Sequence, residues 1–169
     1  MKSDGVQYSF LKSIVLLFLI CSSIVSGQPK QTLGFTILKA SGIDPYDAKV
    51  YSQFLRTAVN KVGVYSVLEF SDISMRLAEQ GMPDMCHEAQ CAVVLGQILG
   101  TEFFGYGSIG KIGKTFIISM QILEVRTGRI IRDITEFYKG NTSGFQKKSI
   151  PLFAQRLCGI EVIDKKRKK

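Results

Sequence analysis

The sequence predicts a mixed α/β fold, in which helices pack on a mixed sheet that contains an antiparallel meander. Two observations support this prediction. Before Gly100, short apolar runs alternate with segments whose apolar residues recur at helical spacing. After Gly100 the apolar period changes from about 3.6 residues to about 2, and three strand patterns follow one another. With the two neighbouring helices before Gly100 counted as one helical unit, the expected element order is β-α-β-α-β-β-β-α, which implies helices layered on a sheet.

The first elements are a strand and a long helix. Residues 33–38 form an apolar run that predicts the strand. Asp44 followed by Pro45 is a helix-start signal, because Asp caps a first turn and Pro is accepted at the first helical position. Apolar residues then recur at helical spacing as far as Val62, and Gly63 is expected to end the helix.

One more strand and two helices are predicted before Gly100. Weak alternation over residues 64–70 indicates the strand. Ser71 is expected to cap a short helix that runs to Gln80, and a loop with Pro83 follows. The second helix is expected over residues 87–99.

The second half of the chain predicts a meander followed by a helix. Short turns at 111–114 and 126–128 favour antiparallel hairpins. A final helix or helix pair is expected over 141–159, with Pro151 at a break or at a fresh first turn. The three expected strands cover residues 102–110, 115–125 and 129–138.

The chain has 169 residues, which is the length of one domain with short appendages. This length excludes a multi-domain enzyme and an ordinary protein kinase. With 46% hydrophobic residues, the composition also excludes wholesale disorder. We expect a single domain over 28–160, preceded by a signal peptide at 1–27 and followed by a basic disordered tail at 161–169.

The first 27 residues have the layout of a secretory signal peptide. Lys2 and Lys12 precede an uncharged apolar run that starts at Ile14, and small residues lead to Gly27. The run is too short for a comfortable transmembrane helix. Cleavage after Gly27 is therefore expected, and the protein is expected to be exported to the periplasm or to associate with the outer membrane.

Two alternatives to this cleavage stay open, an uncleaved anchor and lipidation at Cys21. Ile20 stands where a lipobox requires Gly, Ala or Ser, which argues against lipidation.

The formal net charge of +8 is concentrated partly at the ends of the chain. Residues 28–160 carry fifteen basic and eleven acidic side chains, so the domain itself is only mildly basic. The basic tail is expected to be solvated, and an anionic membrane surface is its possible partner. We expect no nucleic-acid binding, because no aromatic residue is interleaved with the basic run to stack on bases.

The glycines from Gly105 to Gly110 match the dinucleotide-binding pattern, and the stretch from Gly105 to Lys111 matches most of a P-loop. A phosphate- or nucleotide-binding enzyme that uses this stretch is therefore one alternative function. Its context is wrong, because a strand follows instead of a helix and Ile112 replaces the Ser or Thr of a P-loop. We interpret these residues as strand glycines that permit close packing or bulges.

Three cysteines remain in the mature chain. In an oxidising compartment pairing is the default, and the spacing of Cys86 and Cys91 favours a bridge between them. Cys158 is then expected to be a buried apolar residue of the last helix. A redox-active thiol is the rival interpretation, but the chain has no Cys-x-x-Cys spacing to support it.

His87 is the single histidine, and with Cys86 and Cys91 it suggests a thiol or metal protein as a further alternative. A zinc site requires a further ligand, and a Cys–His dyad requires an orienting group. Neither is visible in the sequence, so an exposed histidine near a helix N-terminus is the expected role. We expect no catalytic residue, no cofactor and no metal.

The segment from Cys86 to Ile130 contains Cys-x4-Cys-Ala, a helix with Leu-Gly, then Gly-Ser-Ile-Gly-Lys and Leu-Glu-Val-Arg-Thr-Gly. It resembles the bacterial envelope proteins of the superfamily of the curli secretion channel and the Tol-Pal beta-propeller N-terminal domain. That superfamily also includes penicillin-binding-protein activators and flagellar accessory proteins. The resemblance extends from about Phe35 to Gly159. It implies a nonenzymatic domain with a layered mixed sheet and a bridge between Cys86 and Cys91.

The resemblance implies a module that binds envelope or outer-membrane proteins in the assembly or secretion of surface structures. An activator-type accessory protein of peptidoglycan synthesis is the alternative. The curli secretion channel is a lipoprotein with long membrane-inserting hairpins, whereas this chain has short hairpins and lacks a good lipobox. It therefore resembles the soluble core domain alone, and no functional residue is carried over. The sequence leaves the partner and the oligomeric state open.

Overall fold

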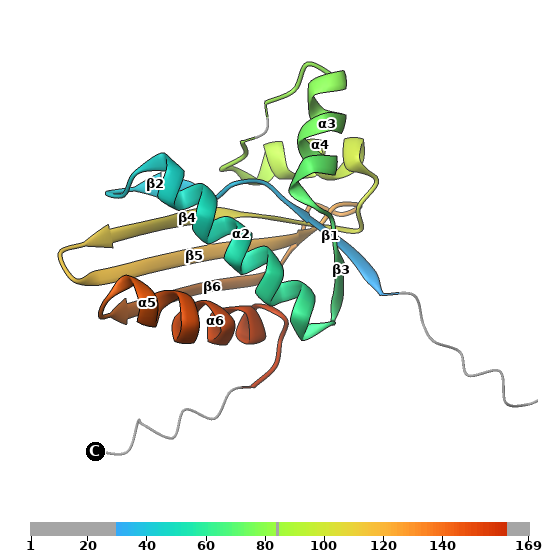
Figure 1. Cartoon of the computed structure of the whole chain (residues 1–169). Helices are drawn as coiled ribbons and strands as arrows, with labels where there is room; N and C mark the ends of the chain where they lie inside the picture. Colours follow the sequence, from blue (N-terminus) through green and yellow to red (C-terminus); the bar gives the residue numbers. More distant parts are fainter. Residues whose placement is uncertain (1–29, 84, 162–169) are drawn as a thin grey trace, which may run out of the picture.

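The fold is described by a computed structural model that covers residues 30–83 and 85–161. The expected signal peptide at 1–27, Cys21 and the basic tail from residue 162 onward lie outside the described residues. The mixed α/β class is confirmed, because one mixed sheet carries helices on both of its faces (Figure 1).

Short strands and helices make up the first half of the described chain, and a meander occupies much of the second half (Figure 1). The elements are β1 (Gln31–Phe35), β2 (Lys39–Ser41), α2 (Pro45–Val62), β3 (Tyr65–Val67), α3 (Phe70–Glu79), α4 (Ala89–Leu99), β4 (Phe103–Ile112), β5 (Thr115–Glu124), β6 (Ile130–Lys139), α5 (Thr142–Gly144), the π-helical η1 (Phe145–Ser149) and α6 (Ile150–Leu157).

The strand order in the sheet is β3-β1-β4-β5-β6, and β2 also pairs with β4. β1 runs parallel to both β3 and β4, and β2 runs parallel to β4. β4, β5 and β6 are antiparallel, with Ile109 opposite Ile118 and Ile117 opposite Phe137. The predicted antiparallel meander is therefore confirmed.

The strand predicted over 33–38 is only partly present: β1 starts earlier, at Gln31, and residues 36–38 belong to no strand. β1 ends at Phe35, and the chain returns to the sheet only at Lys39. Between them the N–H of Leu38 donates to Ser52 Oγ of α2 at 3.0 Å, so this amide bonds to a helix instead of a strand. The apolar run contains no signal that the strand ends at Phe35, and β2 lies beyond the run, over three residues that have no strand pattern of their own.

Two helix starts also differ from the prediction. The strand expected over 64–70 is only three residues long. The helix that follows, α3, begins at Phe70, and its N-cap is Glu69 instead of the predicted Ser71. β3 pairs only with β1, and only at three positions, so no further backbone hydrogen bonds to the sheet extend this strand. α4 begins at Ala89, two residues after the expected start at His87.

The predicted ends of α2 are confirmed. Asp44 Oδ1 accepts the N–H of Tyr46 at 2.7 Å, and Pro45 occupies the first turn. Gly63 ends the helix with φ 80°, in the left-handed region that glycine adopts without a Cβ penalty.

The last helical segment is continuous but changes its winding. Asn141 Oδ1 accepts the N–H of Gly144 at 2.8 Å at its start, and a π-helical stretch leads into α6. Pro151 lies in the first turn of α6, where its missing N–H is tolerated. Of the two expectations for Pro151, the structure shows no break; Pro151 lies in the first turn of α6, where the winding changes from π to α within one helical segment.

The core has two parts, one on each face of the sheet. α2 and α6 lie side by side across one face, where Phe116 and Phe145 stack with ring centroids 4.5 Å apart (Figure 1). α3 and α4 cover Phe104 and Leu123 on the other face. Within the part of the chain that the structure describes, no helix is long and apolar enough to cross a membrane.

Candidate functional site

A groove of about 520 Å³ lies between β2, the start of α2 and the segment that precedes α4. The first wall consists of residues 37–40, and Pro45, Tyr46, Ala48 and Lys49 of α2 form the second. Met85 and His87 supply the third wall. This volume is typical of sites that hold a small ligand. We treat this groove as the candidate site.

The first wall is held in place by glycine and serine. A Cβ atom at Gly110 of β4 would overlap the carbonyl oxygen of Ser41, so glycine is what lets β2 pair with β4. On the helix side, Ser52 Oγ donates to the carbonyl of Ala48 at 2.7 Å and accepts the N–H of Leu38. Residues 37–40 are therefore fixed between the sheet and α2.

A buried arginine fixes the turn of the chain just before this wall. Arg56 of α2 is 3% exposed and donates through Nη2 to the carbonyl of Phe35 at 2.6 Å and through Nη1 to the carbonyl of Leu68. Burial lowers the pKa of Arg56 to about 10, an effect that the charge of Glu69 opposes. The guanidinium is thus still charged at neutral pH and binds the ends of β1 and β3 together.

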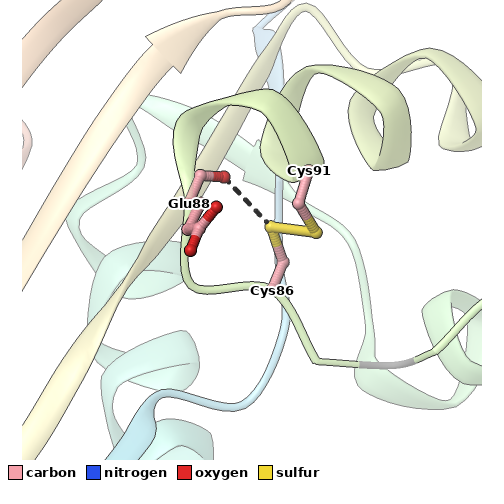
Figure 2. Close-up of a disulfide and its surroundings, with 3 residues drawn as sticks. All are labelled: Cys86, Glu88 and Cys91. Atoms are coloured by element: carbon pink, nitrogen blue, oxygen red, sulfur yellow. Dashed lines mark hydrogen bonds between the residues drawn. A yellow bond between two sulfur atoms is a disulfide. The ribbon is translucent and has the colours of Figure 1, made fainter.

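The third wall is attached to α4 by a disulfide. Cys86 and Cys91 are bridged, with Cα atoms 5.8 Å apart, as expected from the sequence (Figure 2). Cys91 lies in the first turn of α4, and Cys86 is buried in the extended segment before it. The Cys86 sulfur also lies 3.3 Å from the carbonyl oxygen of Glu88. This contact is not a hydrogen bond, because a disulfide sulfur has no proton to donate. The bridge holds Met85 and His87 at the groove.

His87 does not have the exposed position that we predicted. It is half-buried, and its Nδ1 atom is inaccessible and has no hydrogen-bond partner among the described residues. The reason is that α4 begins at Ala89, so the disulfide draws His87 back over the groove instead of placing it on a helix face with Cys91.

The groove is lined by positive charge and apolar surface. Lys39 and Lys49 are exposed, and none of the described residues that line the groove carries a carboxylate. Asp44 and Asp47 belong to the same end of α2 but do not line the groove. An anionic or acidic ligand fits such a lining better than a cationic one.

The stretch from Gly105 to Lys111 does not form a phosphate-binding loop. It lies inside β4, which pairs with β5 over its whole length and with β1 and β2 on its other side. A Cβ at Gly107 would overlap the carbonyl oxygen of Ser119, and one at Gly105 would overlap Met120. The interpretation as close-packing strand glycines is confirmed, and the nucleotide-binding alternative is wrong for these residues.

Cys158 is buried, as predicted, at the end of α6 and is 7% exposed. Burial raises the pKa of its thiol to about 11, which makes it a poor nucleophile at neutral pH.

Among residues 30–83 and 85–161 no group of three or more His, Cys, Asp and Glu side chains is placed to hold a metal ion.

The groove itself was not predicted. Lys39, Lys49 and Met85 belong to no recognisable motif, and they are brought together only by the return of β2 to the sheet and by the disulfide. A second hollow of about 420 Å³ lies between α2 and α6, with Lys61 on its lining, and it was not predicted either.

Comparison with protein-family models gives no match, and neither does comparison with the sequences of characterised proteins. Solved structures do match. The C-terminal domain of LpoB from Salmonella enterica has a TM-score of 0.54 and 16% sequence identity, over 75% of this chain and 93% of that domain. The same domain from Escherichia coli has a TM-score of 0.54 and 16% identity, over 72% and 93%.

The lipoprotein GNA1162 from Neisseria meningitidis has a TM-score of 0.56 and 12% identity, over 78% of this chain and 95% of that one. At these identities the likeness is one of fold. The chain thus has a fold found in bacterial envelope proteins.

Proposed function

We propose that the chain is an exported, nonenzymatic binding module of the bacterial cell envelope that acts in the assembly or secretion of surface structures. The observation that carries the proposal is the fold, which the chain shares over three quarters of its length with the C-terminal domain of LpoB and with the lipoprotein GNA1162.

Two further features support export. The bridge between Cys86 and Cys91 is typical of an oxidising compartment such as the periplasm. The basic and apolar start of the chain also favours a cleaved signal peptide. We propose a periplasmic or outer-membrane-associated location, with the basic tail near an anionic membrane surface.

The finer role has two versions. In one, the module binds components of a surface structure during assembly or secretion. In the other, it is an activator-type accessory protein of peptidoglycan synthesis. Both versions require an envelope protein as partner, and neither requires a catalytic residue of this chain.

Fractionation and cross-linking test the proposal. The full chain is expressed in a bacterial host with its N-terminal segment intact, and the intact mass is measured to locate cleavage and count free thiols. We expect a periplasmic or outer-membrane fraction, a chain that starts near Gln28 and one free thiol. Cross-linking in intact cells followed by mass spectrometry is expected to recover envelope proteins. A cytoplasmic chain with three free thiols in the domain contradicts the proposal.

A further inference from the structure

We propose that the groove binds an extended peptide segment of a partner protein, in which acidic residues are interleaved with apolar ones, and that this peptide adds a strand to the free edge of β2. The inference rests on the proposed function, since it names the kind of partner segment that the binding module holds.

The free edge of β2 is the first observation. Lys39, Ala40 and Ser41 pair with β4 on one side, and no other strand of the described chain pairs with them. The neighbouring β1 is different, because it lies between β3 and β4. An unpaired edge presents main-chain donors and acceptors that an extended peptide satisfies by strand addition. The groove runs along this same segment, since all of residues 37–40 line it.

The apolar surface of the groove is the second observation. Leu38 and Ala48 contribute buried apolar surface to its lining, and Tyr46 and Met85 stand at it with 72% and 52% of their surfaces exposed. Large apolar side chains that remain this exposed beside a concave surface are typical of a binding site. In an extended peptide alternate side chains point the same way, so every second residue would reach this surface.

Charge decides which peptide fits. Lys39 lines the groove from the wall of residues 37–40, and Lys49 lines it from the wall of α2. Asp44 and Asp47, the acidic residues at this end of α2, do not line the groove. Acidic side chains on the peptide complement these cations, whereas a basic peptide would be repelled. A lone anion would use the charges but neither the apolar surface nor the strand edge.

Peptide binding to the mature chain tests the proposal. The probe is a fluorescein-labelled nonapeptide of alternating valine and glutamate with blocked ends, and its binding is followed by fluorescence anisotropy. The first comparison peptide replaces each glutamate by lysine, and the second carries N-methyl groups on alternate main-chain amides. We expect both comparison peptides to bind about tenfold more weakly or worse, because one loses the charge match and the other the main-chain bonds.

Paired charge reversals locate the site. K39E/K49E is expected to weaken binding of the valine–glutamate peptide about tenfold or more and to favour the lysine peptide. K61E/K147E makes the same change in net charge on exposed lysines that do not line the groove, and is expected to bind like the parent chain. Circular dichroism verifies that each variant is folded, and amide chemical shifts of residues 37–40 report contact directly.

Several results would overturn the proposal. Equal binding of the glutamate and lysine peptides removes the charge match, and equal binding of the N-methylated peptide removes strand addition. Equal losses in both double variants indicate a general charge effect. Competition by free glutamate or inorganic phosphate at the peptide's own concentration indicates an anion site only.

The outcome is separable from that of the proposed function. If an envelope partner is captured equally well by the parent chain and by K39E/K49E, the groove proposal fails and the envelope role stands. If the peptide binds the groove but the chain is neither exported nor cross-linked to an envelope protein, the envelope role fails instead.

Discussion

The guanidinium of Arg56 lies over the ring of Phe35, with its central carbon 4.2 Å from the ring centroid, and also donates a hydrogen bond to the carbonyl of the same residue. One side chain of α2 therefore binds both the backbone and the side chain of the last residue of β1. This is the point where the chain leaves the sheet before it returns as β2, so Arg56 determines where the first wall of the groove begins.

Replacing Arg56 by Met is expected to lower the free energy of unfolding by about 3 kcal/mol, because the carbonyls of Phe35 and Leu68 lose their charged donor inside the protein. Arg76 is the matched control, since it is exposed and makes a single hydrogen bond of 3.2 Å to the carbonyl of Leu99. R76M is expected to cost less than about 1 kcal/mol. Chemical denaturation of both variants measures the difference, and equal losses would contradict the anchoring role of Arg56.

Gly96 of α4 lies against Val125, which directly follows β5 in the turn that leads to β6. A Cβ at Gly96 would overlap Val125 Cγ2 and lie 3.3 Å from the Cβ of Phe104. G96A is therefore expected to destabilise the protein by about 1–3 kcal/mol, although alanine favours a helix. V125A removes the overlapping atoms, so G96A/V125A should be clearly less destabilised than the two single variants together. Additive losses in a double-mutant cycle would show that the two residues do not compete for space.

The bridge between Cys86 and Cys91 closes a short loop, and its removal in C86A/C91A is expected to cost about 2 kcal/mol. The larger effect is expected at the groove, because Met85 and His87 lose their attachment to α4. Peptide affinity of the variant is therefore expected to fall together with the amide protection of residues 85–88. C158A, which removes the free thiol and leaves the bridge, serves as the control. Unchanged affinity in C86A/C91A would show that the third wall does not need the bridge.

Cys158 should make the stability depend on pH above neutrality. Its pKa is raised by burial from 9.0 to about 11. The unfolded chain therefore loses this proton first, so the contribution is complete below about pH 9 and is lost as the pH rises towards 11. The loss is expected to reach roughly 2 kcal/mol. Denaturation at several pH values should give a steeper decline for the parent chain than for C158A, in which this thiol is absent. Parallel declines would contradict the assignment to Cys158.

The local elements were predictable because their signals lie within a few residues of one another. The Asp44 cap, Pro45 and Gly63 determine where α2 begins and ends, and the change of apolar period after Gly100 predicts the meander. An expected oxidising compartment and the spacing of Cys86 and Cys91 together favoured the bridge that the structure contains. The glycines of β4 were interpreted correctly from their context, because a strand follows them instead of a helix.

The tertiary structure alone determined the candidate site. The break between β1 and β2 depends on Ser52 and Arg56, which are more than ten residues away from the backbone atoms that they bind. The half-buried position of His87 likewise depends on the start of α4 at Ala89 and on the disulfide that joins the preceding segment to this helix. Hydrophobic periodicity and capping report the conformation of a segment, and they carry no information about which polar group of a distant segment will satisfy a given amide. By itself the sequence therefore determined the layered α/β class and the disulfide of this protein. Long-range hydrogen bonds decided where the edge of the sheet stays unpaired and which charged residues lie beside that edge.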